Sequence, residues 1–254
     1  MNKKVGLQLY TLREYLKTES DIAQTLKKVK AVGYDIVQIS GCGVSDVKVL
    51  SNLVKDAGLI SNSVHEKYDR ITKETDAFVE DCRVMGYTTA AIPHLPEEMR
   101  TIEGYKKVAR EANAAGEKLA KAGVILTYHN HDFEFENLGG IRGIDIIYGE
   151  TNPKFLQSEL DVYWVQSGGA DPAAWILKMK GRAPIVHLKE MGIKGKEHVM
   201  LPVGEGNMNW QSILKALEEV KTGFYYVEQD RCNGEDPFAC IKKSLDNLKK
   251  MGVE

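Results

Sequence analysis

The feature that most constrains the fold of this chain is a regular alternation of short and long segments. Short runs rich in β-branched and aromatic residues are separated by longer amphipathic stretches along all 254 residues. The amphipathic stretches carry apolar residues at helical spacing, and several stop at a glycine, as at Gly33, Gly58, Gly86 and Gly123. The short runs predict eight strands, at residues 5–10, 35–40, 59–65, 88–94, 124–131, 155–164, 184–190 and 224–230.

Eight strand–helix units in a chain of this length predict a single (β/α)8 barrel of the α/β class, with residues 1–254 as one domain. No linker, low-complexity tract or break in composition divides the sequence. A doubly wound open sheet is the main alternative, but such a sheet carries the fingerprint G-x-G-x-x-G after its first strand. The nearest matches in this chain, "GCGVSD" and "VGEGNM", lack the third glycine. We therefore expect the barrel.

The composition is that of a soluble globular protein, with 43% hydrophobic residues, 28% charged residues and a formal net charge of −2. This charge balance gives no electrostatic reason to expect nucleic acid or a membrane as a partner. No apolar stretch approaches the roughly 18 residues of a membrane-spanning helix, and the apolar run after Lys3 and Lys4 is too short for a signal peptide. We expect a cytoplasmic protein, and the sequence leaves open whether it forms a homo-oligomer. Its cysteines form no C-x-x-C pair and are expected to be free thiols: Cys42, Cys82, Cys232 and Cys240.

Polar side chains gather where the predicted strands end. Five of the six histidines lie there, and only His198 does not. In a (β/α)8 barrel the catalytic groups lie at the C-terminal ends of the strands, so these residues predict a polar functional pocket. They are Gln8 and Tyr10, Gln38, His65 and Glu66, His94, His129 to His131, Glu159 and Asp161, His187 and Lys189, and Glu228 and Asp230.

Strand alternation indicates which of these side chains point into the barrel. The residues flanking the polar positions are apolar in the sixth and seventh strands, so Asp161, His187 and Glu228 are expected to face inward. Buried acidic groups need a cation or a proton. This mixed oxygen and nitrogen set suits Mn²⁺, Zn²⁺, Co²⁺ or Mg²⁺. The alternative is a hydrogen-bonded network without a metal ion.

Four segments resemble the strand signatures of a known superfamily. "VGLQLYTLRE", "LDVYW", "VHLKE" and "YVEQD" are similar to the first, sixth, seventh and eighth strands of the xylose isomerase-like barrels. That superfamily includes sugar phosphate isomerases/epimerases, inosose dehydratase and isomerase relatives, and endonuclease IV. The resemblance implies one divalent metal ion, held by a carboxylate on strand five, the aspartate of an L-D motif, a histidine and a final glutamate. The last three correspond to Asp161, His187 and Glu228.

The fifth strand departs from this pattern. Many relatives read E-N-H at its end, whereas this chain reads His129-Asn130-His131. Either His129 or Glu159 could supply the missing ligand, and we favour Glu159 because a buried glutamate otherwise lacks a counter-charge. The endonuclease IV branch adds a histidine three residues after the L-D aspartate. Here that position is Trp164, which argues against DNA repair.

The resemblance implies a metal-dependent isomerase or epimerase that removes a proton α to the carbonyl of a sugar or keto-sugar. Glu228 is the expected base on one side of the substrate. His129, and next His131, is expected to transfer protons on the other, with an imidazole pKa near 6.5. Because a histidine could return the proton to a leaving hydroxyl, a dehydratase or lyase acting on a keto-inositol or 3-keto-sugar is the alternative. A third hypothesis is a non-catalytic sugar-binding barrel or accessory subunit.

The remaining predictions concern the walls of the pocket. Lys189 is expected either to neutralise an oxyanion on the substrate or to form a salt bridge with Glu159 or Asp230. The segments 132–137 and 191–209 are expected to form lids. The residues expected to contact substrate are His65, His94, Asn130, Trp164 and Gln8, with Phe133 and Phe135 as further apolar walls.

Overall fold

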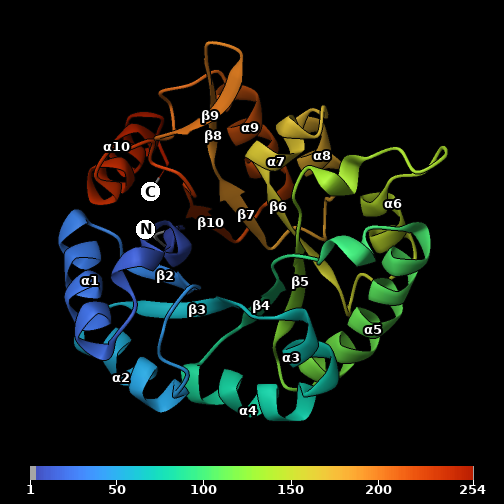
Figure 1. Ribbon diagram of the computed structural model, residues 1–254, viewed down its shortest axis with the longest axis horizontal. Coiled ribbons are helices and arrows are strands. Elements are labelled where there is room, and N and C mark those ends of the chain that lie inside the picture. Colours follow the sequence, from blue (N-terminus) through green and yellow to red (C-terminus); the bar gives the residue numbers. More distant parts are fainter. Residues whose placement is uncertain (1–3, 254) are drawn as a thin grey trace.

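Eight parallel strands close into a barrel in the computed structural model, which describes residues 4–253 (Figure 1). Residues 1–3 and 254 of the predicted domain lie outside the described residues. The strands run around the barrel in the order β1-β10-β7-β6-β5-β4-β3-β2, and β1 pairs with β2. This confirms the predicted fold class. The barrel strands are β1 (Val5–Gln8), β2 (Ile36–Ile39), β3 (Ile60–His65), β4 (Thr89–Ile92), β5 (Ile125–His129), β6 (Gln157–Asp161), β7 (Ile185–Leu188) and β10 (Phe224–Val227).

Helices surround the barrel, and local sequence signals account for several of their ends (Figure 1). Thr18 caps the first long helix in a reciprocal capping box with Asp21, and Gly33 ends that helix in the left-handed conformation. The α-helices are α1 (Glu19–Val32), α2 (Val47–Asp56), α3 (Tyr68–Lys73), α4 (Thr75–Met85), α5 (Ile102–Lys121), α6 (Gly143–Gly149), α7 (Val162–Ser167), α8 (Pro172–Lys178), α9 (Trp210–Val220) and α10 (Pro237–Lys250). Three 3₁₀ helices are described as well, η1 (Leu9–Tyr15), η2 (Glu97–Met99) and η3 (Phe133–Phe135).

The main hydrophobic core lies between the strands and the helices, where Leu160, Val186 and Leu188 are fully buried. A separate apolar cluster of Ile36, Ile185 and Tyr226 fills the barrel interior toward the N-terminal ends of the strands. Gly6 makes room for this plug, because a Cβ there would lie 2.6 Å from the Tyr226 ring. Above the plug the inward positions are polar. The barrel therefore has an apolar floor and a polar mouth.

Seven of the eight predicted strands extend one to three residues past the observed C-terminal ends, and two differences from the prediction concern the site. The sixth strand ends at Asp161 and does not continue to Trp164, because the Asp161 carboxylate accepts the backbone N–H groups of Tyr163 and Trp164 and starts α7. The predicted loop 191–209 begins with an antiparallel hairpin, β8 (Glu190–Lys194) and β9 (Glu197–Leu201). The hairpin follows the C-terminal end of β7 and extends outward past the helices at the top of Figure 1. Its turn includes Gly195 in the left-handed conformation.

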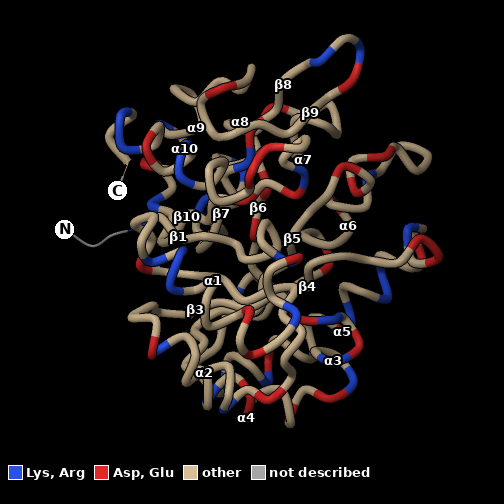
Figure 2. Tube along the Cα trace, turned by 60° about the vertical axis from the view of Figure 1, so that its left-hand side comes forward, with Lys and Arg blue, Asp and Glu red and all other residues tan. Residues whose placement is uncertain are grey.

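Acidic and basic residues are interspersed along the chain (Figure 2). Within residues 4–253 no helix has the length and apolar character needed to cross a membrane. The four cysteines are free, as predicted.

Candidate active site

A cavity of about 240 Å³ opens at the C-terminal ends of the strands, where the sequence predicts the pocket. Eight of its lining residues belong to the polar set predicted at the strand ends, and Ser40 and Pro93 complete it. The eight are Tyr10, His65, His94, His129, His131, Lys189, Glu228 and Asp230.

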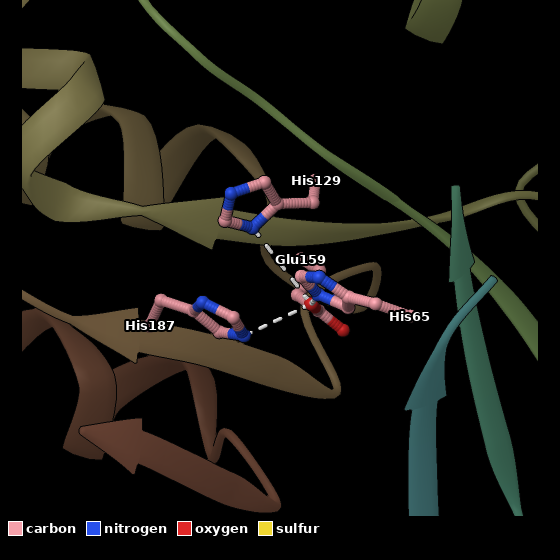
Figure 3. A group of neighbouring side chains, drawn as sticks. All are labelled: His65, His129, Glu159 and His187. Atoms are coloured by element: carbon pink, nitrogen blue, oxygen red, sulfur yellow. Dashed lines mark hydrogen bonds and ion pairs between the residues drawn. The ribbon is translucent and has the colours of Figure 1, made fainter. Parts of the chain in front are cut away.

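Below the cavity lies a carboxylate surrounded by imidazoles (Figure 3). Glu159 is fully buried, and its Oε1 lies 2.5 Å from His65 Nε2 and 2.9 Å from His187 Nε2. The same oxygen lies 3.8 Å from His129 Nδ1. Burial raises the pKa of Glu159, but His187 and His65 outweigh burial and hold the pKa well below its usual range. We call Glu159, His65, His129 and His187 the lower layer.

Above it, one ammonium group lies among three carboxylates. Lys189 Nζ is 2.9 Å from Asp161 Oδ2, 2.9 Å from Glu228 Oε2 and 3.1 Å from Asp230 Oδ2. Burial lowers the pKa of Lys189, but Asp161 and Asp230 outweigh burial and raise the pKa well above its usual value. Burial raises the pKa of Asp230 to about 6. These four residues form the upper layer, in which the predicted Lys189–Asp230 salt bridge is present.

His187 and His129 connect the two layers through opposite ring nitrogens. His187 Nδ1 lies 3.0 Å from Glu228 Oε2, on the side of the ring away from Glu159. His129 Nε2 lies 3.9 Å from Asp161 Oδ2, whereas its Nδ1 faces Glu159. Burial lowers the pKa of His187, but Glu159 and Glu228 outweigh burial and raise the pKa to about 10.

The pKa of His129 differs from the sequence-based expectation of a value near 6.5. Burial, followed by the neighbouring His187, lowers the pKa of His129 well below its usual value. A neutral His129 is therefore a weak proton acceptor with a lone pair available to a metal ion.

Two groups of side chains have the composition and spacing of a metal site. His129, Asp161, His187 and Glu228 form one, and the lower layer forms the other. Within each group the potential ligand atoms lie within 4.8 Å of one another. Asp161 Oδ2 lies 2.9 Å from Lys189 Nζ but accepts no aligned hydrogen bond, so this buried oxygen can take a further cation. The donor set therefore fits a divalent ion, and the predicted Asp161, His187 and Glu228 do come together.

His131 lies just beyond β5 at the cavity wall. Its ring stacks on Phe133, with centroids 5.4 Å apart, and lies 5.1 Å from Trp164. Burial, followed by the charge of Lys189, lowers the pKa of His131 to about 3. Its Nδ1 has no hydrogen-bond partner. His131 is therefore neutral at neutral pH and aligned by aromatic packing.

The other residues predicted to contact substrate occupy different positions. His94 lines the cavity, and Arg100 Nη2 lies 3.0 Å from its Nε2. Gln8 is buried under the cavity and donates to Gln38 Oε1 at 2.6 Å. Asn130 is also buried and accepts the backbone N–H of Asp161 at 3.1 Å. Trp164 lies beside the upper layer, with its ring centroid 5.4 Å from Lys189 Nζ. Gln8, Asn130 and Trp164 do not line the cavity, and substrate contact by these three stays a prediction.

Two buried glutamates that the sequence analysis does not single out organise the mouth. Glu134 accepts the Tyr128 hydroxyl at 2.6 Å and the His131 backbone N–H at 2.7 Å, and burial raises its pKa to about 7. Glu190 accepts the backbone N–H groups of Gly204 and Met208 at 2.8 and 3.0 Å. The aromatic neighbours of Glu134 in "DFEFEN" are a weak signal in the sequence that this glutamate is buried.

Each predicted lid contains a regular element, η3 in the first and the β8–β9 hairpin in the second. In 132–137 the structure has η3, with Glu134 and Phe135 buried. None of the cavity-lining residues comes from this segment or from 191–209. Closure of either segment over a substrate stays a prediction.

Comparison with known proteins places the chain in a family. A profile described as xylose isomerase-like TIM barrel matches residues 26–251. Comparison with proteins of curated function gives no match. A solved structure described as a sugar phosphate isomerase/epimerase from Parabacteroides distasonis is 26% identical, with a TM-score of 0.85 and 100% of each chain covered.

Two more distant structures share the fold. A 3-keto-D-glucoside 4-epimerase from E. coli is 17% identical, with a TM-score of 0.71 and coverage of 98% of this chain and 100% of its own. A xylose isomerase-like TIM barrel protein from Mycobacterium smegmatis, solved in complex with magnesium, is 12% identical, with a TM-score of 0.75 and coverage of 98% and 96%. At these identities the likeness is one of fold. With the family profile spanning most of its length, this chain belongs to the xylose isomerase-like TIM barrel family.

Proposed function

We propose that this protein is a divalent-metal-dependent sugar isomerase or epimerase that removes a proton α to the carbonyl of a sugar or keto-sugar. The observation that carries the proposal is the position of Asp161, His187 and Glu228 under a cavity that Glu228 itself lines. The likeness to a sugar phosphate isomerase/epimerase supports the same class of reaction.

Asp161, His187 and Glu228 would hold the ion, with His129 as the fourth ligand. His129 belongs to the same group of neighbouring ligand atoms, whereas Glu159 Oε1 is already bonded to imidazole nitrogens. Two carboxylates and two imidazoles suit Mn²⁺, Mg²⁺, Co²⁺ or Zn²⁺. A bound ion would supply Lewis-acid stabilisation of negative charge on the substrate oxygens.

Glu228 is the base in this proposal. Burial raises its pKa, but Lys189 and His187 outweigh burial and hold the pKa well below its usual range. Glu228 is therefore ionised at neutral pH, as a base must be, but its lowered pKa makes it a weak proton acceptor in the metal-free protein. Lys189 borders the same cavity and can donate hydrogen bonds to a substrate oxygen that gains negative charge.

His131 is the candidate proton-transfer group opposite Glu228, on grounds of position and not of basicity, because burial lowers the pKa of His131 as it lowers that of His129. If His129 gives its Nε2 lone pair to the ion, that nitrogen cannot also take a proton, and His131 is the remaining imidazole of the segment that lines the cavity. This ordering reverses the sequence-based preference for His129, which stays open to experiment.

A dehydratase or lyase is the second candidate. The groups around the cavity differ in kind, with a carboxylate at Glu228 and an imidazole at His131. A histidine that takes the α proton can return it to the leaving oxygen, which suits elimination.

The test is proton exchange between substrate and deuterated water, using sugars, inososes and 3-keto-sugars with added Mn²⁺, Mg²⁺, Co²⁺ or Zn²⁺. Metal-dependent exchange without loss of water supports the isomerase, and exchange accompanied by an unsaturated product supports the lyase. Binding of a sugar without exchange for any ion would contradict both and favour a non-catalytic sugar-binding barrel.

A further inference from the structure

The proposed reaction gives no role to Glu159, a buried acid that contacts the proposed metal ligand His187. Figure 3 shows three histidines from three different strands directed at its carboxylate. Both contacts shorter than 3 Å, from His65 and His187, end on Oε1. We propose that Glu159 is a positioning residue that fixes which nitrogen of these imidazoles faces the cavity. This inference rests on the proposed metal set.

The surroundings of His187 determine where its proton lies. His187 Nε2 lies 2.9 Å from Glu159 Oε1 and 2.8 Å from Gln38 Oε1. Both atoms are acceptors, because the Gln38 amide nitrogen is committed to Ser63 Oγ at 2.8 Å. A nitrogen between two acceptors carries a hydrogen. His187 Nδ1, on the Glu228 side, is therefore the nitrogen that can release its proton and become a ligand.

His129 shows the same division of its ring. Its Nδ1 is buried without a hydrogen-bond partner, and Glu159 Oε1 is 3.8 Å away. Its Nε2 is on the Asp161 side. The negative charge of Glu159 favours the tautomer with the proton on Nδ1, which leaves a lone pair on Nε2.

Glu159 is itself held in place from the other side. Its Oε2 accepts Thr127 Oγ1 at 3.2 Å and Gln38 Nε2 at 3.1 Å. Because both oxygens have partners and the side chain is fully buried, the carboxylate is a rigid acceptor. Outer carboxylates of this kind orient histidine ligands and raise their basicity, and their loss costs about 10–100-fold in metal affinity.

The first test needs no variant. Nitrogen-15 spectra of the histidine rings in the zinc-loaded protein should show His187 with its proton on Nε2 and its metal bond at Nδ1. His129 should carry its proton on Nδ1. A His187 that binds zinc through Nε2, or a His129 protonated on Nε2, would overturn the inference. If the wild-type protein binds no divalent ion, the proposed function fails, and the same spectra of the metal-free protein still test the inference at His129, whose proton should lie on Nδ1 and not on Nε2.

The second test compares Glu159→Gln with Asp132→Asn by zinc titration. Gln keeps the shape but removes the charge, and we expect affinity to fall about 10–100-fold. Asp132→Asn also replaces a carboxylate by an amide, but Asp132 accepts a hydrogen bond from Ser167 outside both layers, and this variant should keep wild-type affinity. Equal affinity in Glu159→Gln and wild type would contradict the inference. A loss as complete as that of Asp161→Asn would instead identify Glu159 as a ligand. Circular dichroism checks the fold of each variant, and the wild-type spectra decide if Glu159→Gln does not fold.

Discussion

The two polar layers of the barrel mouth have opposite balances of charged groups. In the lower layer one carboxylate, Glu159, faces three histidines. In the upper layer three carboxylates face one ammonium group, that of Lys189. The lower layer is rich in groups that can donate hydrogen bonds, whereas the upper layer has an excess of negative charge. The difference fits the proposal that Asp161 and Glu228 of the upper layer hold a cation together with His129 and His187, while Glu159 orients these two histidines.

The largest expected effect comes from removing a carboxylate of the upper layer. Asp161→Asn should lose metal and activity together, with a loss of affinity beyond the roughly 10–100-fold that an orienting partner contributes. Elemental analysis and the deuterium-exchange assay measure the two effects. Asp132→Asn is the control. Asp132 lies at the same end of the barrel but outside both layers, where its carboxylate accepts a hydrogen bond from Ser167 Oγ at 2.9 Å. Full metal content in Asp161→Asn would show that Asp161 is not a ligand.

Next in size is the loss of an imidazole from the cavity wall. His131→Gln should slow α-proton exchange by about 10²–10⁴-fold while metal content stays unchanged, because only the proton-transfer group is removed. His129→Gln should instead lower metal content. If His129→Gln slows α-proton exchange at unchanged metal content and His131→Gln lowers metal content, His129 is the proton-transfer group and His131 supports the metal site. Unchanged exchange in both would show that the segment only shapes the pocket.

The upper layer is also expected to depend on its ammonium group for stability. Lys189→Met leaves three carboxylates without their cation, and the metal-free protein should lose about 3–5 kcal/mol of unfolding free energy. Urea unfolding with and without Zn²⁺ measures the loss, and the ion should stabilise the variant more than the wild type. Lys180→Met removes an exposed ion pair with Glu219 and should cost no more than about 1 kcal/mol. Equal losses in the two variants would contradict the charge balance described for the upper layer.

The most gradual effect is a pH dependence that both layers share through His187. Its pKa of about 10 lies above the ordinary value of 6.5. Its contribution to the stability of the metal-free protein is therefore complete below pH 6.5 and lost as the pH rises through 10. The slope should reach at most about 1.4 kcal/mol per pH unit. Urea unfolding with a chelator at pH 6.5 and 10 should show this decline in the wild type and not in His187→Gln. An equal decline in both would assign the titration to another group.

Much of the fold follows from the sequence because its signals are local. The glycine at the end of α1 and the aspartate–proline pair at the start of α8 mark helix boundaries without tertiary contacts. The sixth strand is predicted too long because its residues beyond Asp161 are apolar and aromatic, like those of a strand. Their helical conformation depends on an Asp161 side chain that caps from within the barrel. The β8–β9 hairpin is missed because its sequence is short, charged and glycine-containing.

The candidate site also has features that the sequence predicts and features that it does not. Alternation along a strand determines that Asp161, His187 and Glu228 face inward, since each side chain's face depends only on its position in the strand. Alternation does not determine how deep in the barrel each side chain lies. Glu159 and Asp161 lie on one strand and one face, yet Glu159 meets histidines and Asp161 meets Lys189.

The sequence by itself determined the barrel, the end of the barrel that carries the polar residues, and the inward direction of those residues, because these follow from periodicity along the chain. Only the tertiary structure decided which atoms meet. Register between neighbouring strands pairs His129 with Glu159 and Asp161 with His187. This register directs one nitrogen each of His129 and His187 toward Glu159 and the other toward the carboxylates of the upper layer. The sequence does not determine the register, because the register depends on hydrogen bonds between strands far apart in the sequence, and no local pattern specifies them.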